Sequence, residues 1–119
     1  MESIHYAARN GHTAGIQELL KSHAMVTPKT KLAQLTPLHL AAGNGNIAAV
    51  KKLLSSNATV DTQATKHLTP LHLTALNGHE ETLRVLLRHN ADVKAKTRKQ
   101  YSALHLAAKN GHTERPFMN

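Results

Sequence analysis

The sequence predicts an all-α repeat solenoid, a stack of paired antiparallel helices, and three periodic features support this prediction. The tetrad Thr-Pro-Leu-His occupies residues 36–39 and returns unchanged at 69–72, and a third version, Ser-Ala-Leu-His, occupies 102–105. Each tetrad is followed by small residues and an Asn-Gly pair. Leucine pairs then recur in the same register. Such self-similarity indicates units that bury their apolar faces against their neighbours.

Each tetrad predicts the start of a short helix. Thr36, Thr69 and Ser102 are favourable N-cap residues, because their hydroxyl groups accept from amides that lack a partner in the first turn. Pro37 and Pro70 suit the first helical position. A degraded first copy of this helix begins near residue 4. About two turns later a glycine can take the left-handed conformation that commonly ends a helix; these glycines are Gly11, Gly45, Gly78 and Gly111.

A second helix is predicted after each glycine, since apolar residues recur there at helical spacing and charged residues occupy the outer positions. The apolar positions are Ile16, Leu19, Leu20, Ile47, Val50, Leu53, Leu54, Leu83, Leu86 and Leu87. Asn57 and Asn90 stand where a left-handed residue would end this helix, and His23 holds the same place in the first copy. Thr74 replaces an inner alanine, and we expect its hydroxyl to bond back to the preceding turn.

The last copy is expected to be incomplete. Pro116 takes the place that Val50 and Leu83 hold in the earlier copies, and three residues follow it in the sequence. A proline can begin a helix, but three further residues cannot complete one, so the last copy is expected to be half a repeat. Two explanations stay open: Phe117 and Met118 fold over the uncovered apolar flank, or the array continues in a longer protein.

The period and the Thr-Pro-Leu-His-x-Ala signature resemble those of the ankyrin repeat over residues 4–112. The resemblance implies one domain over 1–119, with a capping repeat at 1–30, repeats at 31–63 and 64–96, and a truncated repeat at 97–119. It also implies hairpin-like loops between repeats, here called fingers, which project on one side and lie beside one another.

The fingers depart from the usual Asp-x-x-Gly of the family. The corresponding pairs are Lys31 and Gln34, Ala64 and His67, and Thr97 and Gln100. Glycine takes a positive φ at the lowest cost, so we expect these fingertips to be less regular than those of the family.

The formal net charge is +8, with fifteen Lys and Arg against seven Asp and Glu. Basic residues crowd the predicted fingers; these are Lys29, Lys31, Lys66, Lys94, Lys96, Arg98 and Lys99. With the fingers side by side, the resemblance implies a basic ridge along their tips. The alternative is a solvated surface that only maintains solubility.

The resemblance places partner binding on the fingers and on the concave face of the first helices. Carried over position by position, it gives Arg9, Asn10, Leu32, Ala33, Leu35, Gly43, Asn44, Thr65, Lys66, Leu68, Leu76, Asn77, Arg98, Lys99, Tyr101, Lys109 and Asn110. Leu35, Leu68 and Tyr101 directly precede the caps and are expected to align as an apolar stripe. Apolar anchors beside basic side chains suit a protein partner with an acidic, amphipathic surface. Alternatively, Leu35 and Leu68 only cover the base of the fingers.

No catalytic, cofactor or metal site is predicted. The tetrad histidines lie one repeat apart, roughly 8–10 Å, whereas zinc holds its nitrogen ligands at about 2 Å. In the family such histidines are structural and hydrogen-bond across repeats. The chain contains no cysteine, which excludes disulfides and cysteine-ligated zinc. No serine, threonine or histidine combines with a base and an orienting group as nucleophilic catalysis requires.

The sequence therefore predicts a non-catalytic adaptor or scaffold module that binds another protein. One alternative is binding of a polyanion, either nucleic acid or an anionic membrane, although Tyr6, Tyr101 and Phe117 are the only aromatic residues available for base stacking. Another is a fragment of a larger ankyrin-repeat protein. We expect a soluble monomer in the cytoplasm or nucleus, because the chain has neither a long apolar run nor a signal-peptide pattern. Association through the incomplete last repeat is the alternative to the monomer.

Overall fold

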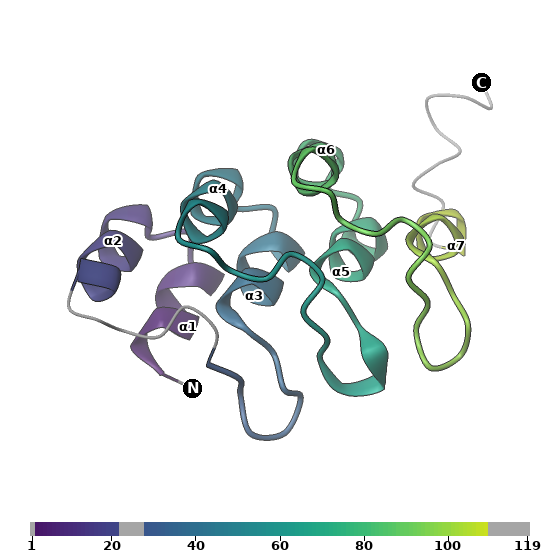
Figure 1. The fold of residues 1–119 in the computed structure, drawn as a ribbon, viewed down its shortest axis with the longest axis horizontal. Coiled ribbons are helices and arrows are strands. Elements are labelled where there is room, and N and C mark those ends of the chain that lie inside the picture. The colour runs from purple at the N-terminus through teal and green to yellow at the C-terminus, as the bar shows by residue number, and fades with distance from the viewer. Residues whose placement is uncertain (1, 22–27, 110–119) are drawn as a thin grey trace.

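Seven α-helices form the described part of the chain, which comprises residues 2–21 and 28–109 of a computed structural model. They are α1 (Ser3–Arg9), α2 (Thr13–Lys21), α3 (Pro37–Gly43), α4 (Ile47–Ser55), α5 (Pro70–Asn77), α6 (Glu80–Arg88) and α7 (Ala103–Lys109). A 3-10 turn, η1, spans Thr65–His67. The first helices α1, α3, α5 and α7 form one row and the second helices α2, α4 and α6 form another, with the loops projecting below the first row (Figure 1). The predicted all-α solenoid is confirmed.

The tetrads begin the first helices as predicted. The Thr36 amide donates to His39 Nδ1 over 3.1 Å, and the His39 amide donates to Thr36 Oγ1 over 3.3 Å. The same reciprocal pair forms at Thr69 and at Ser102. In the degraded first copy Glu2 takes this position, since its amide donates to His5 Nδ1. Each first helix therefore starts with a capped turn.

The same histidine rings tie each helix start to a following loop. Nε2 of His5 lies 2.8 Å from Pro28 O, Nε2 of His39 lies 2.8 Å from Leu68 O, and Nε2 of His72 lies 2.9 Å from Ala95 O. Because Nδ1 of each ring accepts an amide hydrogen, Nε2 carries the proton and donates to the carbonyl. The predicted structural role of these histidines across repeats is confirmed.

Burial lowers the pKa of two of these histidines. His39 is fully buried, and desolvation lowers its pKa from 6.5 to about 4; the charge of Lys29 acts in the same direction, and the hydrogen bond to Leu68 opposes it. Burial also lowers the pKa of His72, although hydrogen bonds to two backbone carbonyls act to raise it. Both rings are therefore neutral in the folded protein at physiological pH.

The turns between the helices use the left-handed residues that the sequence predicts. Positive φ values occur at Gly11, Gly45, Gly78, Asn57 and Asn90. Gly45 is the most restricted of them, because a Cβ there would meet the ring of His79, from the next repeat, at 2.7 Å. The predictions for Gly111 and His23 lie outside the described residues.

The core fills the space between the two rows of helices. Leu38, Leu71, Leu53 and Leu86 contribute large buried side chains, and buried alanines of α3 and α5 allow neighbouring first helices to pack closely. Thr74 is fully buried among them, and its hydroxyl donates to Pro70 O over 2.8 Å, as predicted. The second helices also pack on one another, α2 on α4 and α4 on α6.

Candidate functional site

The three loops that precede α3, α5 and α7 are closed fingers that lie side by side (Figure 1). One backbone hydrogen bond closes each finger: Thr30 N to Leu35 O at 2.9 Å, Ala64 N to Leu68 O at 2.7 Å, and Thr97 N to Tyr101 O at 2.9 Å. No strand is assigned to residues 28–109, so the fingers are hairpin-like only in their closure.

Hydrogen bonds join each fingertip to the next. Thr65 N donates to Ala33 O and Arg98 N donates to Lys66 O, both over 2.9 Å. These two bonds are equivalent, since both donors and both acceptors are one period apart in the sequence. Lys29 Nζ adds a contact of 3.0 Å to Gln63 O in the next finger. The predicted adjacency of the fingers is confirmed, and the tips form one connected surface.

Three polar residues take the positive φ that the family's glycine would take. Gln34, His67 and Gln100 stand in its place, with φ values of 59°, 61° and 71°. The first and third fingers close around this single left-handed residue, and the expectation that the tips are less regular or more mobile than those of the family stays a prediction. The middle finger does differ, because η1 places Lys66 at a positive φ as well. Each of the three residues also makes a backbone hydrogen bond within its own finger: Gln34 N donates to Thr30 O, His67 N to Ala64 O, and Gln100 N to Thr97 O.

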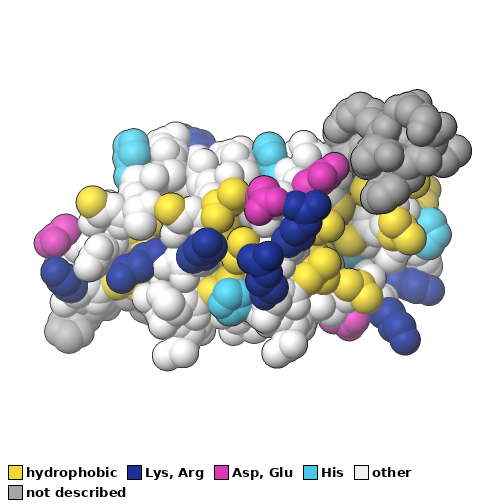
Figure 2. Space-filling view, turned by 90° about the horizontal axis from the view of Figure 1, so that it is seen from above, with side chains coloured by type: hydrophobic (Ala, Val, Ile, Leu, Met, Phe, Trp, Pro, Cys, Tyr) yellow, Lys and Arg dark blue, Asp and Glu magenta, His cyan; other side chains and the backbone are white. Residues whose placement is uncertain are grey.

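The basic residues of the fingers are all exposed; they are Lys29, Lys31, Lys66, Lys94, Lys96, Arg98 and Lys99. The two ion pairs found within residues 2–21 and 28–109, Lys21 with Glu18 and Arg84 with Glu81, lie on second helices. On the face over those helices, basic and acidic side chains are mixed (Figure 2). The positive charge of the fingers thus has no ion-pair partner within the described residues.

The predicted apolar stripe is half-buried along its length. Leu35 and Leu68 line one shallow hollow of about 340 Å³ between the first two fingers, together with Leu32 and Lys66. Leu32, at the tip, is 94% exposed. The hollow therefore offers apolar surface beside a lysine. The half-burial of Leu35 and Leu68 shows that they also cover the base of the fingers.

Tyr101 continues this surface next to α7. Lys109 Nζ lies 5.0 Å from the centroid of its ring, within cation–π range, and the His105 ring lies 6.3 Å away. Two of the predicted contact residues, Tyr101 and Lys109, are thus in contact with each other. Asn110, the next predicted contact residue, lies outside the described residues.

Asn44 and Asn77 have a structural role that the resemblance did not indicate. Asn44 Nδ2 donates to Arg9 O over 2.9 Å, and Asn77 Nδ2 donates to Gly43 O over 2.8 Å. Each amide thereby binds a carbonyl at the end of the preceding first helix, while its side chain stays exposed. The recurrence of asparagine at the same place in successive copies was the sequence signal that could have indicated this structural role. Leu76, also a predicted contact, is partly buried in α5.

Sequence reasoning included Leu32 among the contact residues but missed one exposed aromatic residue of the first copy. Tyr6, on α1, is 47% exposed, and the guanidinium carbon of Arg9 lies 5.1 Å from its ring centroid. An aromatic and a basic residue therefore stand together at both ends of the row of first helices.

Two further properties concern only the residues that the structure describes. Within them, no three histidine, cysteine, aspartate or glutamate side chains are placed to hold a metal ion. Their helices are all too short or too polar to cross a membrane.

The comparison with known families agrees with this architecture. A family model described as ankyrin repeats, in three copies, matches residues 1–64 and 44–115. No curated protein matches the sequence. The two matched stretches together cover all seven helices, and the chain belongs to the ankyrin repeat family.

Proposed function

We propose that the protein is a non-catalytic binding module that captures an acidic, amphipathic segment of another protein. Ankyrin repeats are generally protein–protein interaction modules. The proposed site is the finger surface, defined as residues 28–36, 61–69 and 94–102. The observation that carries the proposal is the hollow between the first two fingers, where apolar side chains stand beside Lys66.

The finger surface is organised before any partner binds. Backbone hydrogen bonds close each finger and connect Ala33 with Thr65 and Lys66 with Arg98. A partner would therefore not have to order these loops, and that ordering cost is a main reason why flexible sites bind weakly. This supports recognition by docking onto a preformed surface.

The chemistry of the surface sets the chemistry of the partner. Leu32 and the partly exposed Leu35 and Leu68 would cover apolar side chains of the partner, and their burial supplies most of the affinity. The exposed lysines and Arg98 would meet carboxylates, which accelerate encounter and favour one orientation. An acidic segment with a few apolar anchors fits both requirements.

The experiment is capture of cross-linked partners by three forms of the chain. The first variant combines Leu68→Ala with Tyr101→Ala and removes apolar contact. The second combines Arg98→Glu with Lys99→Glu and reverses finger charge. The control combines Lys51→Glu with Arg88→Glu, an equal charge change on the exposed face of the second helices.

We expect both finger variants to bind the partner at least tenfold more weakly than the wild type, a loss of roughly 1.4 kcal/mol of binding free energy. The control should bind the partner as the wild type does. Far-UV circular dichroism checks that all forms stay helical. Equal loss in the control would show that the capture depends on net charge alone, and loss of helicity in the first variant would show that the apolar stripe belongs to the core.

A second candidate function is binding of a polyanion through the same fingers. It is favoured by the exposed basic side chains, which have no ion-pair partner within residues 2–21 and 28–109. Binding by charge alone weakens steeply as salt increases. Titration with duplex and single-stranded nucleic acid and with anionic vesicles at low and physiological salt separates the two candidates. Affinity that persists at physiological salt supports the polyanion, and affinity that vanishes there excludes it.

A further inference from the structure

An asparagine followed by a glycine stands at the end of each first helix, and the side chains of these asparagines differ in their contacts. The side-chain amide of Asn44 donates to Arg9 O over 2.9 Å, and that of Asn77 donates to Gly43 O over 2.8 Å. The side chain of Asn10 is exposed and makes no hydrogen bond within residues 2–21 and 28–109. The fourth pair, at 110–111, lies outside the described residues together with the expected half repeat around Pro116.

The Asn-Gly sequence allows a reaction that needs only water. The backbone nitrogen of the glycine attacks Cγ of the asparagine, the bond from Cγ to Nδ2 breaks, and the proton of the attacking nitrogen leaves with Nδ2 as ammonia. The cyclic succinimide then adds water and opens to aspartate or to isoaspartate. Glycine favours the ring closure, because it has no Cβ to obstruct the approach and its backbone is the most flexible.

We propose that Asn10 is a site of spontaneous conversion to aspartate and isoaspartate, and that Asn44 and Asn77 are protected from it in the folded protein. Closure requires the side chain to rotate until Cγ reaches the nitrogen of the next residue. At Asn44 and Asn77 this rotation breaks the hydrogen bond to the preceding first helix. A hydrogen bond of ordinary net strength should slow the closure roughly two- to tenfold.

The backbone does not account for a difference between the first two pairs. Asn10 has φ −94° and ψ 3°, and Asn44 has φ −98° and ψ 4°. The glycine after each of them has a φ of 70°. The amide of that glycine donates to Ala8 O over 3.3 Å in the first copy and to Ala42 O over 3.1 Å in the second. Each amide has to leave a similar bond before it can attack, so the side-chain contact is the feature that distinguishes the two sites.

The surroundings of the two glycines are also alike. A Cβ on Gly11 would lie 3.0 Å from Cγ of Asn46, and a Cβ on Gly45 would lie 2.7 Å from the ring of His79. Both glycines are therefore restrained by a side chain of the following repeat. Neither restraint touches the side chain of the reacting asparagine.

Conversion would change the charge at one end of the row of first helices. Arg9, the neighbouring residue, places its guanidinium carbon 5.1 Å from the centroid of the Tyr6 ring. A carboxylate at residue 10 would follow this basic residue at the C-terminal end of α1, where the helix dipole disfavours negative charge. The inference is independent of the proposed function, since Asn10 is not part of the finger surface.

The test is incubation of the 119-residue chain at mildly alkaline pH, followed by peptide mapping with mass spectrometry. The fraction of aspartate and of isoaspartate is measured separately at residues 10, 44 and 77. A parallel incubation in urea that unfolds the chain gives the rate that each local sequence allows without the fold. Dividing the folded rate by the unfolded rate at each residue isolates the effect of the structure.

We expect this ratio to be about threefold or more higher at residue 10 than at residues 44 and 77. Both aspartate and isoaspartate should form at residue 10, because the succinimide opens at either carbonyl. Since the three residues are compared in the same molecules, rare global unfolding affects all of them equally. Equal ratios at the three residues, a lower ratio at residue 10, or formation of aspartate there without isoaspartate would each overturn the proposal.

Discussion

The buried ring of His39 should make the protein lose stability as the pH falls from about 7.5 to about 5.5. In the folded protein burial lowers its pKa from 6.5 to about 4, and in the unfolded chain the ring regains its ordinary value. Between these two values the unfolded state binds more protons, so the free energy of unfolding rises with pH. The stabilisation that comes from keeping the buried ring neutral is complete above about pH 6.5, and it is lost as the pH falls from 6.5 toward about 4.

The magnitude follows from the two pKa values. At about pH 5.5 the unfolded ring is roughly nine-tenths protonated, whereas the folded ring is almost entirely neutral, which lowers the free energy of unfolding by about 1 kcal/mol. The full difference, reached below about pH 4, is about 3 kcal/mol. His72, whose pKa burial also lowers, adds a loss of the same sign.

Urea unfolding followed by far-UV circular dichroism measures this loss directly. Between about pH 7.5 and about pH 5.5 the unfolding midpoint should fall by roughly 0.5–1 M. His39→Gln should be less stable than the wild type at the higher pH, because it breaks the hydrogen bond to Leu68, and should lose about 1 kcal/mol less on acidification. An NMR titration of the His39 ring with a midpoint near 6.5, or an unchanged pH dependence in His39→Gln, would refute the reasoning.

Three further predictions concern the turns and the contacts between repeats. Gly45→Ala should destabilise the fold by about 2 kcal/mol or more, because the alanine would need a positive φ and would collide with the ring of His79. Gly43→Ala is its control, since that glycine ends α3 with ordinary contact distances, and thermal unfolding should show a neutral or slightly stabilising effect. Asn77→Ala should lower the free energy of unfolding by about 1 kcal/mol, and an unchanged value would mean that its bond to the preceding helix contributes nothing. Gln100→Gly should raise it by about 0.5–1 kcal/mol by removing the strain of a left-handed glutamine, which chemical denaturation can detect, and a destabilised variant would show that the glutamine side chain matters more.

Much of the fold could be predicted because its signals are local. The hydroxyl of Thr36 and the ring of His39 are three residues apart, so the capped turn forms whatever the rest of the chain does. The left-handed turns at Asn57 and Asn90 depend on the conformational preferences of single residues. The candidate site was harder to predict. Leu35 and Leu68 were placed correctly beside each other, but how far each was buried depended on packing at the base of the fingers.

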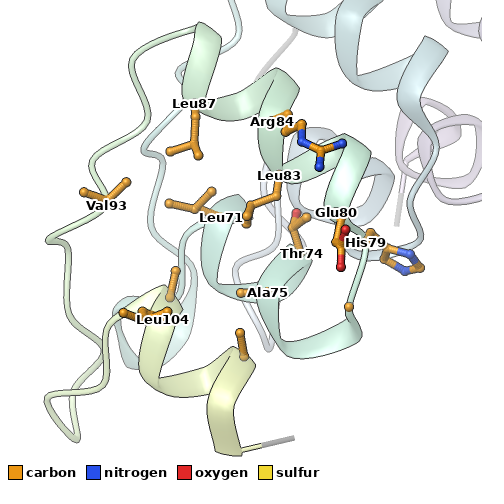
Figure 3. A pocket seen from close by; sticks show the side chains of 13 residues that line it. Leu71, Thr74, Ala75, His79, Glu80, Leu83, Arg84, Leu87, Val93 and Leu104 are labelled. Atoms are coloured by element: carbon orange, nitrogen blue, oxygen red, sulfur yellow. The ribbon is translucent and has the colours of Figure 1, made fainter. Parts of the chain in front are cut away.

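By itself, the sequence determined the period, the helix starts and ends, and the positions of the fingers, since each depends on interactions within one repeat. Only the tertiary structure showed that Arg98 bonds to Lys66, that Asn77 bonds to Gly43, and that apolar side chains of α6 and α7 line one hollow (Figure 3). These features join residues about one repeat apart, and whether they form depends on the distance and angle between neighbouring units. The packing of small side chains between the helices sets that geometry, and it is not encoded in any single repeat.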